Sequence, residues 1–206
     1  GLGLLVITIG EPMRKIIFKG NLLTKYKGKK NIRLVLEKRL KSEENLWYWD
    51  NHYAIDEMAR ANRTKMSLAA GCTSAVSPMT NWDDNIEMAE QKIVTGHCKH
   101  TDAFNKKADA VLVSGGSDDV IWDILNGNKI QNFYMNLMYP NDKRYVTVDR
   151  HAISIVLGRT ATKKENSLTD KQYEFFADCY REVAKDLQMI PNLVQSITWQ
   201  TWRRIK

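Results

Sequence analysis

Side chains with catalytic chemistry gather in the stretch "ILNGNKIQNFYMNLMYPNDKRYVTVDRHA", residues 124–152. Lys129 follows a tight turn, and Asp149 and His151 follow the apolar tetrad "YVTV". A carboxylate can stabilise positive charge in a transition state, whereas a lysine can bind phosphate or, when desolvated, attack as a neutral amine. These groups can act only if the surrounding elements hold each of them in a defined place.

A tight hairpin between two helices is predicted at the turn formed by Asn126, Gly127 and Asn128. The first helix is expected to end near Leu125 and the second to begin near Lys129. Glycine and asparagine tolerate the left-handed conformations that such a reversal needs. The free N–H groups at the start of the second helix, together with the lysine, form a positive site of phosphate size.

Asp149 stands where the N-cap of a further helix belongs, directly before a segment that contains Arg150 and His151. An N-cap carboxylate accepts hydrogen bonds from the first free N–H groups and is therefore held at the mouth of the helix. Two roles stay open for Asp149, namely catalysis by its carboxylate and capping alone. His151 is expected to form a local hydrogen bond.

Positive charge is concentrated near the start of the chain. The 206 residues carry a formal net charge of +7, and residues 13–42 hold eleven of the 31 Lys and Arg, with Glu37 as their one acid. Such a block favours a polyanion such as nucleic acid as a partner, with a solvated basic tail as the alternative. The apolar opening, residues 1–12, is too short to span a bilayer and lacks a basic leader, so we interpret it as upstream sequence rather than a signal peptide.

Cysteine spacing bounds the chemistry and the compartment. Cys72, Cys98 and Cys179 lie far apart, which argues against a disulfide framework and against a thiolate metal cluster. The pattern fits a reducing cytoplasm. No segment reaches the length of a membrane span. We expect a monomer with no metal site.

Helical periodicity along the chain predicts an all-α fold. Helices are expected at residues 31–43, 51–75, 81–95, 103–114, 117–125, 129–138, 150–158, 169–188 and 191–205. The one β-like piece is residues 145–148, "YVTV", which is too short to make a sheet by itself. The expected organisation is a basic N-terminal arm at residues 1–49 and a helical domain at residues 50–206, although no Pro/Gly/Ser linker marks a boundary.

The segment from the hairpin to the aspartate resembles the helix-hairpin-helix Gly/Pro-Asp superfamily of DNA glycosylases, and its endonuclease III branch in particular. The features that carry this resemblance are Leu125, Gly127 and Lys129, followed by Val148, Asp149 and His151. Upstream, "AAGCTSAVSPMTNWDDNIEMAEQKI" is similar to the helix and turn that line the flipped-base pocket, and "KADAVLVSG" to the helix before the hairpin. The likeness extends over residues 50–206 and points to a divergent, phage-associated branch.

The resemblance implies a compact multi-helix glycosylase-like fold with DNA as the partner. Asp149 would stabilise the oxocarbenium-like transition state after a base is flipped from the stack. Lys129 would serve either as a Schiff-base nucleophile with lyase activity or as a phosphate contact. The implied DNA contacts are Asn126, Gly127, Asn128, Lys129, Arg150 and His151, and the implied base-pocket residues are Ser77, Asn81, Gln195 and Trp199.

The chain departs from the family pattern in ways that bear on function. The hairpin lacks the second glycine, Val76 stands where the branch often has a glutamine, and the four-cysteine iron–sulfur loop is absent. We therefore expect no cofactor other than a monovalent cation at the hairpin. Three functions stay open: hydrolytic release of a damaged or modified base, modification of a hypermodified thymine on the same fold, and non-catalytic DNA binding.

Overall fold

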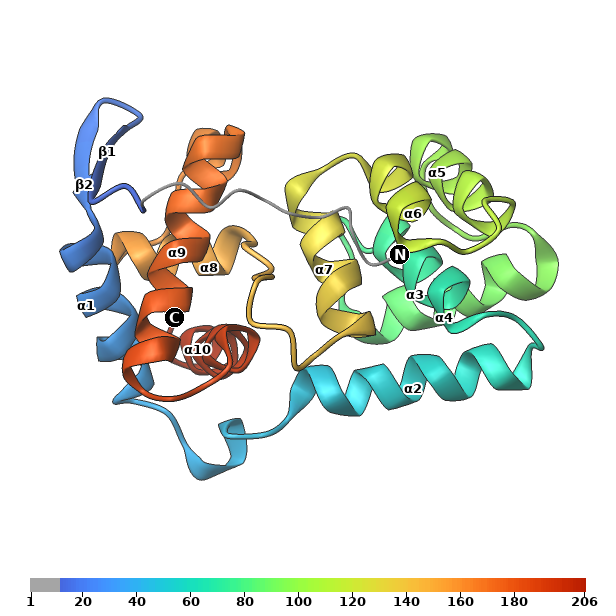
Figure 1. Ribbon diagram of the computed structural model, residues 1–206, viewed down its shortest axis with the longest axis horizontal. Helices are drawn as coiled ribbons and strands as arrows, with labels where there is room; N and C mark the ends of the chain where they lie inside the picture. The colour runs from blue at the N-terminus through green and yellow to red at the C-terminus, as the bar shows by residue number, and fades with distance from the viewer. Residues whose placement is uncertain (1–11) are drawn as a thin grey trace. The chain divides into compact units, whose positions relative to one another are not determined.

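The computed structural model describes residues 12–206, and ten α-helices make up most of them (Figure 1). They are α1 Lys25–Leu36, α2 Trp47–Ala61, α3 Met66–Ala75, α4 Trp82–Thr95, α5 Asp102–Leu112, α6 Asp118–Leu125, α7 Asn128–Met138, α8 Arg150–Leu157, α9 Asp170–Asp186 and α10 Pro191–Ile205. The remaining regular elements are the strands β1 Lys15–Phe18 and β2 Asn21–Thr24 and the short 3-10 helices η1 Lys41–Glu43 and η2 Lys163–Asn166. The expected helical architecture is confirmed, and the β-hairpin is an addition to it.

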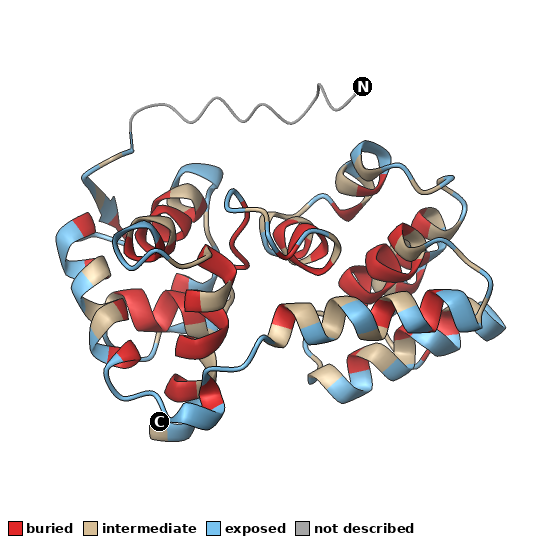
Figure 2. Ribbon diagram, turned by 60° about the horizontal axis from the view of Figure 1, so that its bottom comes forward, coloured by how far each residue is buried: buried red, intermediate tan, exposed pale blue. Residues whose placement is uncertain are grey.

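No helix within residues 12–206 is both long enough and apolar enough to cross a membrane. Residues 1–11 of the apolar opening lie outside the described residues. Most helices carry a buried stripe and an exposed stripe (Figure 2), as expected when one face of an amphipathic helix packs on a core.

The chain forms two compact units that come from different parts of the sequence. The first combines the described residues up to Trp47 with Asn141–Lys206. The second is the continuous stretch Tyr48–Pro140. In chain order, the second unit is therefore an insertion between the two parts of the first.

The core of the first unit is built on α9, which packs against α1, α8 and α10. Thr169 begins this helix with a capping box, in which its hydroxyl accepts from Gln172 N at 3.2 Å and its own N–H donates to Gln172 Oε1 at 3.0 Å. Phe175, Phe176 and Tyr180 are then fully buried along the apolar face. Local capping and helical spacing together explain why the sequence predicts this helix well.

In the second unit, α3 lies at the centre and contacts α4, α5, α6 and α7. Small residues allow this close packing. At Gly71, an added Cβ would lie 2.7 Å from Val111 Cγ1 and 3.0 Å from Ile121 Cγ2, distances that a real Cβ does not reach without displacing its neighbours. The Ala-Ala-Gly-Cys run of α3 is thus dictated by the approach of neighbouring helices.

The basic segment near the start of the chain is part of the first unit's core, so the solvated-tail alternative is wrong. Ile32, Val35 and Leu36 of α1 are buried, as are Phe18 and Leu23 of the hairpin. Five of the eleven basic side chains in residues 13–42 form ion pairs, and four of those five pair with acids of α9. The pairs are Arg14–Glu182, Lys25–Asp178, Lys25–Glu182, Lys29–Glu182, Lys29–Asp186, Arg33–Asp186 and Arg39–Glu44.

Two helix predictions are corrected by capping residues. The first helix runs over α1 rather than 31–43, because Thr24 is its N-cap and accepts from Lys27 N at 3.2 Å. The predicted helix 51–75 is divided into α2 and α3. Arg63 adopts the left-handed conformation with φ 52°, and Thr64 N donates back to Ala59 O at 2.9 Å, a C-terminal motif that ends α2.

The "YVTV" segment, residues 145–148, is buried and belongs to no helix or sheet. Tyr173 from α9 forms hydrogen bonds with its backbone. The Tyr173 hydroxyl donates to Val146 O at 2.7 Å and accepts from Val148 N at 2.9 Å. A side chain therefore supplies hydrogen bonds that buried backbone requires.

Glu43 generates a prediction about acid sensitivity. Its carboxylate accepts from Arg204 Nε at 2.6 Å, Leu40 N at 2.8 Å and Thr201 Oγ1 at 2.8 Å. The hydrogen bond from Arg204 is the main cause that lowers the pKa of Glu43 to about 2. Because the folded pKa lies below the ordinary value of 4.5, the stabilisation is complete above pH 4.5 and is lost as the pH falls towards 2.

Glu43→Gln should lower the free energy of unfolding by about 1–3 kcal/mol at pH 7, as expected for loss of hydrogen bonds to a buried charge. The difference from wild type should shrink between pH 4.5 and pH 2. Denaturant unfolding at several pH values measures both quantities. Glu37→Gln, at an exposed position on the same segment, is the control. A pH-independent difference would mean that the charge of Glu43 contributes nothing.

Candidate functional site

The helix hairpin lies where the sequence predicts it, between α6 and α7. Asn126 ends α6 in the left-handed conformation, with φ 44° and ψ 48°. Gly127 is the N-cap of α7 and is extended, with φ −167°. Of the turn residues expected to tolerate left-handed backbone, Asn126 adopts it, whereas Gly127 is extended.

Two side chains brace this hairpin. Lys107 Nζ, from α5, donates to Leu125 O at 2.6 Å, which places a positive charge at the carboxyl end of α6. Burial lowers the pKa of Lys107. Gln131 Nε2, from the first turn of α7, donates to Trp122 O at 2.9 Å. The turn is thus held from α5 and α7 and is a preformed element.

The start of α7 suits an anion. Gly127 has no side chain with which to cap the helix, and its carbonyl accepts the first helical hydrogen bond, from Gln131 N at 2.9 Å. Lys129 is exposed in the first turn, and no carboxylate forms an ion pair with it among residues 12–206. A positive helix end beside an exposed lysine attracts phosphate.

The predicted cap at Asp149 is confirmed. Asp149 Oδ1 accepts from Ala152 N at 2.8 Å, and the residue is half-buried at the start of α8. Within the described chain, Oδ2 makes no hydrogen bond to protein. Burial and the nearby charge of Asp149 raise the pKa of Tyr180, whose hydroxyl donates to Ala152 O at 3.0 Å. One carboxylate oxygen is therefore held and the other is open to a ligand or water.

His151 lies between two arginines. Burial is the first cause that lowers its pKa, and the charges of Arg150 and Arg203 lower it further, whereas the charge of Asp149 acts in the opposite direction. No hydrogen bond to His151 occurs in the part of the chain that the structure describes, so the local hydrogen bond expected from the sequence is not formed.

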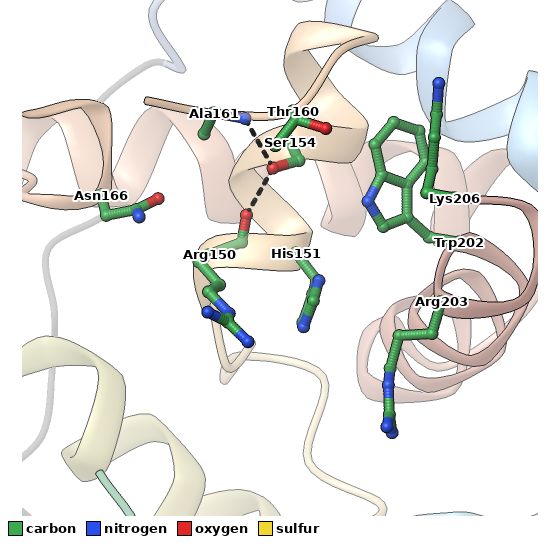
Figure 3. Close-up of a pocket in the computed structure, with 9 residues that line it drawn as sticks. All are labelled: Arg150, His151, Ser154, Thr160, Ala161, Asn166, Trp202, Arg203 and Lys206. Atoms are coloured by element: carbon green, nitrogen blue, oxygen red, sulfur yellow. Dashed lines mark hydrogen bonds between the residues drawn. The ribbon is translucent and has the colours of Figure 1, made fainter. Parts of the chain in front are cut away.

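The imidazole instead lines a cavity of about 380 Å³ in the first unit (Figure 3). The lining residues come from α8, the segment after it, η2 and α10: Arg150, His151, Ser154, Thr160, Ala161, Asn166, Trp202, Arg203 and Lys206. In Figure 3, the side chains of Arg150, His151 and Arg203 point towards the same side, and the indole nitrogen of Trp202 faces the cavity.

The four predicted base-pocket residues do not line this cavity. Ser77 donates to Ser74 O at 2.8 Å, and Asn81 is the N-cap of α4, accepting from Asp84 N at 2.9 Å. Gln195 is buried in α10. Trp199 packs edge-on against Trp47, with 6.0 Å between ring centroids.

The predicted residues are divided between the two units. Asp149, Arg150 and His151 belong to the first unit together with Gln195 and Trp199, whereas the hairpin residues 126–129 belong to the second with Ser77 and Asn81. Sequence reasoning missed Arg203 and Lys206. A signal for them existed, because residues 191–206 contain three basic residues and no acid.

A family model matches residues 37–206, which include the hairpin, Asp149 and both helices that carry the cavity's cations. The chain belongs to DUF7178, a family of unknown function. No curated protein and no solved structure matches the chain. The DUF7178 match begins directly after α1, so the β-hairpin and α1 complete the core from outside the matched region.

The hairpin of this DUF7178 protein yields a prediction about its backbone. Asn126→Val should destabilise the protein by about 1–3 kcal/mol, because a β-branched residue is strained in left-handed backbone. Gly127→Ser should be neutral or stabilising, since serine is a good N-cap and a Cβ there would lie 3.7 Å from Ile130 Cγ1. Asn126→Gly is the matched control. Denaturant unfolding compares the three variants. A large loss of stability in Gly127→Ser would transfer the conformational requirement back to the glycine.

Proposed function

We propose that this protein is a DNA glycosylase-like enzyme, a divergent relative of the helix-hairpin-helix Gly/Pro-Asp superfamily, with Asp149 as its catalytic carboxylate. The observation that carries the proposal is the geometry of Asp149. One oxygen is fixed by the Ala152 N–H at 2.8 Å, and the other makes no hydrogen bond to the described residues. A half-buried carboxylate held in this way is preorganised to meet positive charge.

The chemistry asks little of the protein beyond that carboxylate. As the glycosidic bond breaks, its electron pair leaves with the base, and positive charge develops on the sugar. Asp149 stabilises that charge through Oδ2 and orients a water, whose oxygen bonds to the anomeric carbon. The water loses one proton to the solvent, and the departing base takes one proton up from the solvent. Partial burial strengthens the attraction, because the local dielectric constant is below that of water.

The hairpin supports DNA as the substrate. Its glycine-capped helix start and exposed Lys129 are suited to one backbone phosphate. An amine nucleophile must be desolvated to lose its proton readily, and Lys129 is exposed. We therefore assign Lys129 to phosphate contact, in preference to Schiff-base formation.

Asp149→Asn should reduce base release by about 100-fold or more while leaving DNA affinity unchanged or higher, because the carboxylate acts in the transition state. Asparagine keeps the N-cap, so folding should persist. The measurement is mass spectrometry of bases released from DNAs that carry damaged bases, modified thymines or modified cytosines. Thr169→Ala, which removes the cap of α9 but no carboxylate, is the control for a loss of capping.

The competing function is a non-catalytic DNA-binding module, which the Asp149–Ala152 hydrogen bond also fits, since it is the bond that a cap alone would make. Unchanged base release by Asp149→Asn would restrict Asp149 to capping. DNA binding by the wild type without release of any base in the panel would favour the module. A group added to a modified thymine, seen as a mass increase in the DNA, would favour base modification.

Lys129→Ala should weaken binding to duplexes of different sequence to a similar extent, because a phosphate contact carries no base information. The slope of log K against log salt should fall in magnitude by about 1, the share of one counterion-releasing contact. Fluorescence anisotropy over a range of salt concentrations measures both. Lys106→Ala removes an exposed charge from α5 of the same unit as a control. An unchanged salt slope in Lys129→Ala would exclude the phosphate contact.

A further inference from the structure

The arginines of this protein divide into two groups. Eight of the eleven form ion pairs with carboxylates: Arg14, Arg33, Arg39, Arg60, Arg144, Arg159, Arg181 and Arg204. Within residues 12–206, the other three, Arg63, Arg150 and Arg203, form no ion pair. Two of these three line the same cavity. Two guanidinium groups that line one cavity without a carboxylate partner need an explanation.

The side chains that line the cavity carry positive charge but no negative charge. They include the cations Arg150, Arg203 and Lys206 and the imidazole of His151, but no Asp or Glu. The charge of Asp149 acts on His151 from outside the lining. The cavity lining is therefore a concave surface of positive charge.

The charges of Arg150 and Arg203 both lower the pKa of His151. Both oppose protonation of the imidazole, which places α8 and α10 charges within electrostatic reach of the same ring. Two cations of α10 form cation–π contacts with aromatic rings of the same helix. The Arg203 guanidinium lies 4.8 Å from the Trp199 ring centroid, and Lys206 Nζ lies 4.9 Å from that of Trp202. Cation–π contacts position a charge without neutralising it.

We propose that this cavity binds the phosphate of a nucleotide, with Arg150 and Arg203 as the two principal donors and His151 between them. Planar guanidinium groups bind phosphate oxygens through paired hydrogen bonds. The indole N–H of Trp202, which faces the cavity in Figure 3, supplies a neutral donor. A cavity of about 380 Å³ exceeds the size of a phosphate group and leaves room for the attached nucleoside.

Two kinds of molecule could supply the phosphate that this cavity binds. One is a nucleic-acid strand, through its phosphodiester, and the other is a free mononucleotide. Neither requires Asp149 to be catalytic, so this inference goes beyond the proposed function. Asp149→Asn should retain phosphate binding, because it removes no cation from the cavity. The glycosylase proposal and the phosphate site can therefore fail independently.

The test is NMR titration of the histidine side chains with inorganic phosphate, thymidine, thymidine 5′-monophosphate and a short single strand of DNA. Phosphate-bearing probes should raise the pKa of His151 by about one unit or more, since a bound anion offsets the repulsion from the two arginines. Thymidine should not. His52, His97 and His100 do not line the cavity and are internal controls. His151→Gln assigns the signal.

Variants identify the donors. Arg150→Gln and Arg203→Gln should each weaken binding of thymidine 5′-monophosphate by about 10-fold or more, the usual effect of losing a charge-assisted hydrogen bond. Arg63→Gln is the matched control, because it removes the unpaired arginine outside the cavity. Both cavity arginines are exposed and form no ion pair with residues 12–206, so their replacement should leave the fold intact.

The outcomes separate the two sources and can overturn the inference. If the single strand binds more tightly than the mononucleotide, and both arginine variants weaken it, the source is a nucleic-acid backbone. If the mononucleotide binds equally well or better, the source is a free nucleotide. The proposal is wrong if thymidine shifts His151 as much as its monophosphate does, if no phosphate probe shifts it, or if both arginine variants bind like wild type.

Discussion

The hydroxyl of Tyr173 ties the chain together at the point where the candidate chemistry begins. It donates to Val146 O and accepts from Val148 N, so one side chain of α9 bonds to two backbone groups of a buried segment. Each such hydrogen bond contributes about 0.5–1.5 kcal/mol to stability. Asp149 follows this segment directly. The hydrogen bonds from α9 thus fix the backbone that directly precedes Asp149.

The net charge of a sequence predicts the charge sign of a binding partner, but it does not predict where on the protein that partner binds. The basic block at residues 13–42 is the most conspicuous electrostatic feature of the sequence, yet acids of α9 form ion pairs with four of its eleven cations. Lys25 is almost fully buried, and its Nζ lies 3.2 Å from Glu182 Oε2 and 3.6 Å from Asp178 Oδ2. Within residues 12–206, cations without an ion pair also lie at less conspicuous positions, on the helix hairpin and on α8 and α10. Counting charges along the sequence does not show which acids the fold brings close to which cations.

Local signals predicted the parts of the fold that depend on local physics. The predicted turn at Asn126 and the predicted N-cap at Asp149 place helix ends correctly. The helices predicted at 169–188 and 191–205 are also formed, and they begin at the capping box of Thr169 and at the first-turn Pro191. The sequence also contains a signal for the β-hairpin. Lys19 and Gly20 both have positive φ, of 47° and 87°, in a two-residue turn between apolar runs.

What the sequence could not predict depends on contacts between distant residues. The backbone of residues 145–148 bonds to Tyr173, which lies 25 or more positions further along the chain. The cavity is lined by residues of both α8 and α10. For the candidate site, the sequence identified Asp149, Arg150 and His151, but it could not identify Arg203. No local pattern states which helix a given arginine will lie beside, or whether a carboxylate will reach it first.

The insertion of Tyr48–Pro140 between the two parts of the first unit has a consequence for synthesis on the ribosome. The second unit is one continuous stretch, so it can fold as soon as it has emerged. The helix α1, made earlier, must wait for partners that do not yet exist, since Asn31 bonds to Val156, 125 residues further along. Until then, Ile32, Val35 and Leu36 present apolar surface to the cell, and nascent chains are most exposed to aggregation and to chaperones in this interval.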